Sequence, residues 1–132
     1  MLKIFYSDTD ITLEQLATTP EAFVAQRSVF ALRVGQSMFV QAGRGSLLLP
    51  TKMPGVTAFW RHAEGNQSLT IDPCDYAWVE VTLEGIWMAR TATSEQGSLV
   101  VDLGEQTEWQ LVNLWRCSLR WMPVEQPLPK AC

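Results

Sequence analysis

The chain has 132 residues and a formal net charge of −4, from ten Lys and Arg against fourteen Asp and Glu. This length is typical of one domain with a single hydrophobic core, so no disulfide or metal is needed for stability. The acidic balance disfavours a groove that follows phosphates and contact with an anionic membrane surface. We therefore expect neither nucleic acid nor a membrane as a partner.

Charged residues make up only 18% of the chain, against about 25% in an average domain. The chain also contains six Trp, five Phe and two Tyr. Aromatic enrichment combined with depletion of charge is typical of the centre of a protein interface. The composition therefore favours a protein that covers part of its surface with a partner.

The first residues, MLKIFYSDTD, become acidic too early for an export signal, which needs a longer apolar run. No stretch approaches the roughly 20 apolar residues of a membrane span. The three cysteines are an odd number and lack the spacing of metal ligands, so we expect thiols rather than disulfides or a zinc site. These features predict a cytoplasmic protein without a metal or cofactor.

Two kinds of element are expected in the N-terminal third. Residues 2–6 are apolar and precede the turn-prone SDTD, which predicts a strand. A short helix is expected over residues 13–17 (LEQLA). A longer helix follows over residues 20–34, because Thr19 can cap its start and Gly35 can end it.

The middle of the chain changes from helical to alternating patterns. SMFVQA and SLLLP flank GRG, which predicts a hairpin with glycines in its turn. Residues 56–62 and 68–71 predict two further strands. Apolar side chains at the odd positions of 77–90 predict a half-buried strand, and residues 98–103 predict the strand that returns beside it.

The stretch TEWQLVNLWRCSLRW, residues 107–121, fits two periods. Its odd positions are apolar six times in seven, which indicates a strand. A helix is the alternative interpretation, because Leu111, Trp115 and Leu119 also form a helical stripe. The acids lie early and the arginines late in the stretch, as the helix dipole favours. We favour a strand over residues 108–119, since Trp, Val and Cys are weak helix formers and the preceding turns indicate a meander.

Together these patterns predict an α+β fold, with an antiparallel, meander-rich β-sheet and one main N-terminal helix packed on it. We expect a single globular domain over residues 1–122. Prolines at 123, 127 and 129 end regular structure, so residues 123–132 are expected to form a loose C-terminal tail.

The run VAQRSVFALRVGQSMFVQ leading into SLLLP, together with CDYAWVEVTLEGIWMA and LVNLWR, resembles a family of small uncharacterised proteins found in cyanobacteria. The resemblance spans most of the chain and rests on a scaffold pattern rather than on a catalytic motif. It implies a cytoplasmic protein of a photosynthetic bacterium with a housekeeping or assembly role. It brings no known chemistry with it.

The tryptophans are the first candidate for a binding surface. Trp109, Trp115 and Trp121 share one face of the predicted strand, and Trp87 is available from a neighbouring strand. Covered by the helix, this aromatic layer is core. Exposed, it is a stacking platform for a sugar or a flat apolar molecule, or the centre of a protein contact.

Arg27 is the second candidate, because it lies within an apolar helical stripe formed by Phe23, Phe30 and Val34. A guanidinium there must extend past the apolar surface to water or find an acid. We expect a buried stem and an ion pair that ties the helix to the sheet. The alternative role is to anchor a ligand.

No catalytic set is evident. His62 is the only histidine, and a pairing of it with Cys74 would need the two to meet in space. Acids on either side of Cys74 disfavour its reactive thiolate. Glu80 and Glu84 stand about 13 Å apart on a strand, too far for a glycosidase pair.

The function expected from these features is a non-enzymatic protein-interaction or assembly module that uses an aromatic, charge-poor patch. Its partner is a second copy of the chain, in a homodimer, or another protein. The alternative is a binder of a small ligand, either a flat apolar molecule or a sugar, with a Trp-lined site. An enzyme comes third.

Overall fold

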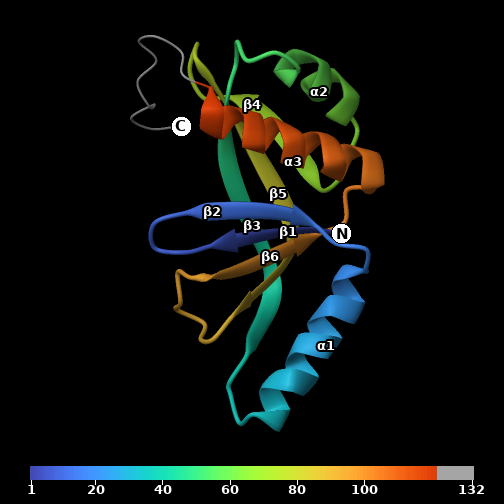
Figure 1. Cartoon of the computed structure of the whole chain (residues 1–132), viewed down its shortest axis with the longest axis vertical. Coiled ribbons are helices and arrows are strands. Elements are labelled where there is room, and N and C mark those ends of the chain that lie inside the picture. Colours follow the sequence, from blue (N-terminus) through green and yellow to red (C-terminus); the bar gives the residue numbers. More distant parts are fainter. Residues whose placement is uncertain (122–132) are drawn as a thin grey trace.

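The computed structural model describes residues 1–121, and the predicted tail over 123–132 lies outside them. This part of the chain forms six strands and three helices (Figure 1). In order they are β1 (Leu2–Tyr6), β2 (Ile11–Gln15), α1 (Pro20–Arg33), β3 (Phe39–Pro50), α2 (Val56–Ala63), β4 (Leu69–Pro73), β5 (Trp78–Ala89), β6 (Gly97–Val101) and α3 (Glu105–Arg120). The predicted α+β class with an antiparallel sheet is confirmed.

The six strands form one sheet that is organised around β5. The order is β2-β1-β6-β5-β3, with β4 also paired to β5, and every pair is antiparallel. One edge of β5 pairs with β3 along the whole of both strands. The other edge is shared, because β4 pairs with residues 79–83 of β5 and β6 pairs with residues 86–88.

Glycines allow neighbouring chain segments to approach closely near Gly85, which lies between the part of β5 that pairs with β4 and the part that pairs with β6. A Cβ at Gly85 would collide with the backbone carbonyl oxygen of Val100, a group that cannot move aside. The GRG sequence lies opposite, inside β3, where a Cβ on Gly43 or Gly45 would collide with Trp87 or Tyr6. The predicted hairpin at GRG is therefore wrong, and these glycines serve packing between strands instead of a turn.

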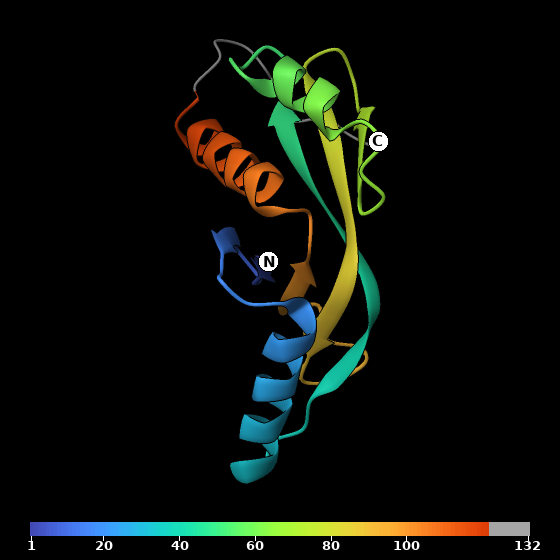
Figure 2. The same cartoon turned by 90° about the vertical axis from the view of Figure 1, so that its right-hand side faces the viewer.

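Helices cover both faces of the sheet. The main core cluster joins Leu99 and Val101 of β6 to the apolar sides of α2 and α3, which lie together at one end of the molecule (Figure 2). Successive side chains of a strand point to opposite faces, so Val100 joins a second, smaller cluster. The same cluster contains Phe23 of α1, together with Met1 and Met88.

Helix α1 forms as predicted and is the element that covers the second face. Its N-cap is Thr19, whose side-chain oxygen accepts a hydrogen bond from the Ala22 N–H at 3.2 Å. Phe23 and Ala31 are buried, but most of the second half of the helix is exposed. The buried residues of α1 are thus few and lie toward both of its ends, at Pro20, Phe23 and Ala31.

The strand predicted for residues 108–119 is wrong, because this segment lies within α3. Its buried side chains, Glu108, Leu111, Val112 and Leu114, recur at helical spacing. Several of these residues have weak helix propensity, but burial against the main core favours the helix. The predicted N-terminal helix α1 packs on the other face of the sheet, so α3 is needed to cover the main core. Residues 56–62 also lie in a helix, α2, and residues 13–17 contribute to β2 instead of a helix.

None of the helices within residues 1–121 combines the length and apolar character that a membrane crossing requires.

A buried carboxylate fixes the position of α3. Glu108 is 2% exposed, and its Oε1 atom lies 3.4 Å from the α-ammonium nitrogen of Met1 and accepts a hydrogen bond from Gln15 Nε2 at 3.3 Å. Its Oε2 atom accepts from the Leu103 N–H at 3.0 Å. The α-ammonium also donates to two backbone carbonyls just after β2, at 2.8 and 3.0 Å. Glu108 thus connects β1, β2 and the start of α3.

We predict that Glu108→Gln lowers the free energy of unfolding by roughly 3 to 5 kcal/mol, because it leaves the buried α-ammonium without its counter-charge. Chemical denaturation measures the loss. Glu105→Gln, in the exposed first turn of the same helix, is the control and should change stability by about 0.5 kcal/mol or less. Equal losses of unfolding free energy in the two variants would contradict the role of Glu108 as the counter-charge of the α-ammonium.

Candidate functional site

The tryptophans do not form the predicted layer on one face of the sheet, because three of them lie on or next to α3. A helix turns about 100° per residue, so positions six apart point about 120° away from one another. Trp109 is 61% exposed, whereas Trp115 and Trp121 are half-buried against the main core. Trp87 is half-buried on β5 and stands at a tilt to the ring of Tyr6, with 6.0 Å between ring centroids.

Arg27 is exposed on α1, which corrects the expectation of a buried stem and an ion pair. Within residues 1–121 no acidic side chain forms a salt bridge with it. Its guanidinium carbon instead lies 5.2 Å from the centroid of the Phe23 ring, a cation–π contact. Phe23 is the buried residue one turn earlier on the same helix.

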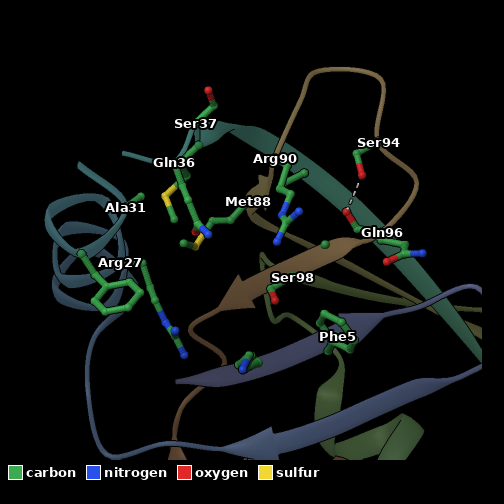
Figure 3. A pocket seen from close by; sticks show the side chains of 15 residues that line it. Phe5, Arg27, Ala31, Gln36, Ser37, Met88, Arg90, Ser94, Gln96 and Ser98 are labelled. Carbon is green, nitrogen blue, oxygen red and sulfur yellow. Dashed lines mark hydrogen bonds between the residues drawn. The ribbon is translucent and has the colours of Figure 1, made fainter. Parts of the chain in front are cut away.

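Arg27 borders a hollow of about 600 Å³ between α1 and the sheet, which we call the α1 groove (Figure 3). Its floor is the face of β1, β6 and the end of β5 that carries the second core cluster. Cationic side chains line it from three separate elements: Lys3 from β1, Arg27 from α1, and Arg90 directly after β5. No Asp or Glu lines it within the part of the chain that the structure describes.

Two of the three cations that line the groove contact one aromatic ring, that of Phe23. Lys3 Nζ lies 5.7 Å from the centroid of the Phe23 ring, the same ring that holds the guanidinium of Arg27. Glu14 offsets part of the charge of Lys3 through a partly exposed contact at 3.4 Å, which contributes little in water. Arg27 and Arg90 form no salt bridge within residues 1–121. The groove is therefore locally positive in an acidic chain.

Apolar side chains complete the lining. Phe5 of β1 is 40% exposed and Phe30 of α1 is 57% exposed. Met88 is buried in the floor, and Met38 is half-buried between α1 and β3. Methionine adapts its shape to different apolar partners, so this lining can receive an apolar molecule.

Trp115 lines a second hollow, of about 550 Å³, beside the turn between β1 and β2. Its charged lining is acidic, from Asp8, Asp10 and Glu95. Asp10 is used locally, since its Oδ1 atom accepts the Ile11 N–H at 2.8 Å. Burial raises the pKa of the Tyr6 hydroxyl, which also borders this hollow. Asp8 and Asp10 belong to this turn, and Glu95 belongs to the loop between β5 and β6. The hollow therefore has no lining cation in the described part of the chain, and we regard the α1 groove as the stronger candidate.

The cysteines add no reactive centre to either hollow. Cys117 is free and exposed on α3. The expectation that every cysteine is a thiol is wrong for Cys74, which is disulfide-bonded in the structure. Within residues 1–121 no three His, Cys, Asp or Glu side chains gather in an arrangement that could hold a metal ion.

The sequence pointed to Arg27 but not to Lys3 or Arg90. Alternation in β1 places Lys3 and Phe5 together on the face opposite Leu2 and Ile4, and this signal was present. What the sequence could not provide is that α1 lies over this face, or that the end of β5 brings Arg90 to it. Both depend on long-range pairing of strands.

A family model described as Alr0857-like matches residues 1–119. The chain belongs to the Alr0857-like family. This confirms the resemblance to a family of small cyanobacterial proteins, and in this member of the Alr0857-like family the match includes every element of the α1 groove. No curated protein and no solved structure matches the chain. The function of the groove must therefore be argued from its own residues.

We predict that Arg27→Met changes the free energy of unfolding by about 1 kcal/mol or less, since an exposed arginine loses only a cation–π contact. Arg33→Met, at another exposed position of the same helix, is the control for loss of a surface charge. Denaturant unfolding of both variants measures the effect. If Arg27→Met alone lowered the free energy of unfolding by several kcal/mol, the result would instead support a buried ion pair at Arg27.

Proposed function

We propose that this protein is a non-enzymatic binding module that holds a small ligand in the α1 groove. One observation carries the proposal: cationic side chains from three separate elements surround one hollow that no acid lines within residues 1–121. A volume of about 600 Å³ falls in the range of small-molecule sites, roughly 300 to 1,000 Å³. Apolar side chains such as Phe5, Phe30 and Met38 are mixed with polar ones in its lining, and ligand sites combine both kinds.

Binding is favoured over catalysis by the kinds of side chain in the groove. Its described lining includes no His, Cys, Asp or Glu, which are the usual proton-transfer groups and nucleophiles. Ser94 and Ser98 supply hydroxyl groups, and Lys3 supplies the amine of the described lining, with its Nζ 3.4 Å from Glu14. The Ser94 hydroxyl already donates to the Gln96 carbonyl at 2.9 Å (Figure 3).

We predict that the neutral fluorescent dye Nile red binds the wild-type protein and that Ser98→Phe weakens this binding about tenfold or more, because the new ring occupies the groove. Ser98 is half-buried and its side chain lies in the groove (Figure 3). Fluorescence titration measures the affinity.

The matched control is Thr82→Phe, which adds the same ring to a half-buried position of β5 outside the groove lining. It should leave dye binding unchanged. Equal binding by wild type and Ser98→Phe, or no binding at all, would remove the groove as the ligand site.

A second candidate function is self-association, which is favoured by the outward face of α1. Val29 and Leu32 are 50% and 81% exposed, and Ala22 and Ala25 share their helical face. In an antiparallel pair of α1 helices, the small side chains of one copy lie opposite the large ones of the other. The same pairing brings the end that carries Glu21 to the end of the partner helix that carries a basic residue, Arg33.

We predict for this candidate that sedimentation velocity shows a concentration-dependent homodimer that Leu32→Glu dissociates, since two like charges would then enter the contact. Leu119→Glu is the control, because Leu119 is 62% exposed on α3, away from the helix pair. A monomer at every concentration, or equal effects of the two variants, would exclude pairing through α1.

A further inference from the structure

We propose that the α1 groove selects an anionic amphiphile, a molecule that carries one carboxylate or phosphate monoester group on an apolar body. This inference rests on the proposed function, because it names the class of ligand that the same groove binds. It comes from the two kinds of lining that the groove combines, one cationic and one apolar.

The cationic part of the groove is built to receive an anion. Lys3 Nζ and the guanidinium carbon of Arg27 lie 5.7 and 5.2 Å from the same ring centroid, that of Phe23, so one ring positions two of the cations that line the groove. Arg90 extends into the hollow from a different wall than Arg27 (Figure 3). A bound anion would supply the opposite charge that the described lining lacks, and guanidinium groups bind carboxylate and phosphate with two parallel hydrogen bonds.

Within residues 1–121 several cations outside the groove, such as Arg33 and Arg61, also form no salt bridge. What distinguishes Arg27 and Arg90 is that they line one hollow together. On the upper part of the same sheet, the exposed guanidinium of Arg44 pairs with Glu84 at 2.9 Å, on the neighbouring strand. Arg27 and Arg90 form no such pair within residues 1–121. Within residues 1–121, Glu14 forms the one salt bridge with a cation of the groove, at 3.4 Å from Lys3, and it does not line the groove. The two arginines are therefore free to bind a ligand.

The apolar part of the groove argues against an inorganic ion as the whole ligand. Phe5 and Phe30 present rings that are 40% and 57% exposed, and exposed rings lose contact with water when an apolar body covers them. Met38 and Met88 add adaptable apolar surface. A free phosphate ion would leave these side chains unused, and a neutral apolar molecule would leave the three cations unused.

The test is displacement of Nile red by four compounds of known chemistry. Dodecanoate and dodecyl phosphate carry both parts of the proposed ligand and are used below the concentrations at which they form micelles. Dodecanol has the apolar body alone, and inorganic phosphate has the anionic group alone. We expect at least one of the two anionic amphiphiles to bind about tenfold or more tightly than dodecanol, and inorganic phosphate to leave the dye bound.

The matched variant is the double substitution Arg27→Gln and Arg90→Gln, which removes both guanidinium groups at exposed positions. We expect it to weaken binding of the anionic amphiphile about tenfold or more and to leave dodecanol unchanged. Arg33→Gln, on the same helix but outside the groove lining, should bind like the wild type. Binding of Nile red itself, together with circular dichroism, reports that each variant is folded.

Two results would overturn the inference and leave the proposed function in place. These are equal affinity for dodecanol and both anionic amphiphiles, or an unchanged affinity of the double variant. Displacement of the dye by inorganic phosphate alone would also overturn it, since the apolar lining would then have no part in recognition. Failure of Nile red and of every compound to bind would remove the proposed function together with the inference.

Discussion

The buried carboxylate of Glu108 is the polar contact that joins the first two strands to the start of α3. Apolar contacts alone hold a helix on a sheet without fixing its direction, whereas a charge removed from water is tolerated only where its partners are in place. Glu108 finds them on Met1, Gln15 and Leu103. The side chain of Met1 belongs to the second core cluster with Phe23. The contact between Glu108 and Met1 therefore also helps to position the start of β1 beneath α1. It therefore constrains the groove on the opposite face of the sheet.

The parts of the fold that the sequence predicted are those in which several local signals agree. In α1 the cap at Thr19 and the helical stripe coincide, and in β5 the alternation is uninterrupted from Val79 to Leu83. The sequence of α3 fits both the two-residue period of a strand and the period of a helix. The helix forms because it buries Leu111, Val112 and Leu114 against the rest of the molecule. At GRG the glycines indicate a turn locally, but their role comes from strands that lie far away in the sequence.

The candidate site divides in the same way. Arg27 could be recognised from sequence because a cation in an apolar stripe needs an explanation. Its partner could not, since the guanidinium contacts an aromatic ring one turn away instead of an acid. The six-residue spacing of the tryptophans has opposite meanings on a strand and on a helix, so one error in the secondary structure of 108–119 also misplaced the predicted binding surface.

The pairing of β1 with β6 has a consequence for the order in which the protein folds. Leu2 lies opposite Val101, so a strand from the start of the chain is completed by one near the end. During synthesis β1 and β2 can form only a two-stranded hairpin, which is marginally stable in water. The floor on which α1 packs, Met88 and Val100, is also made late. During synthesis the apolar residues of α1 therefore stay exposed until Met88 and Val100 have been made, and folding is completed after β6 and α3 leave the ribosome.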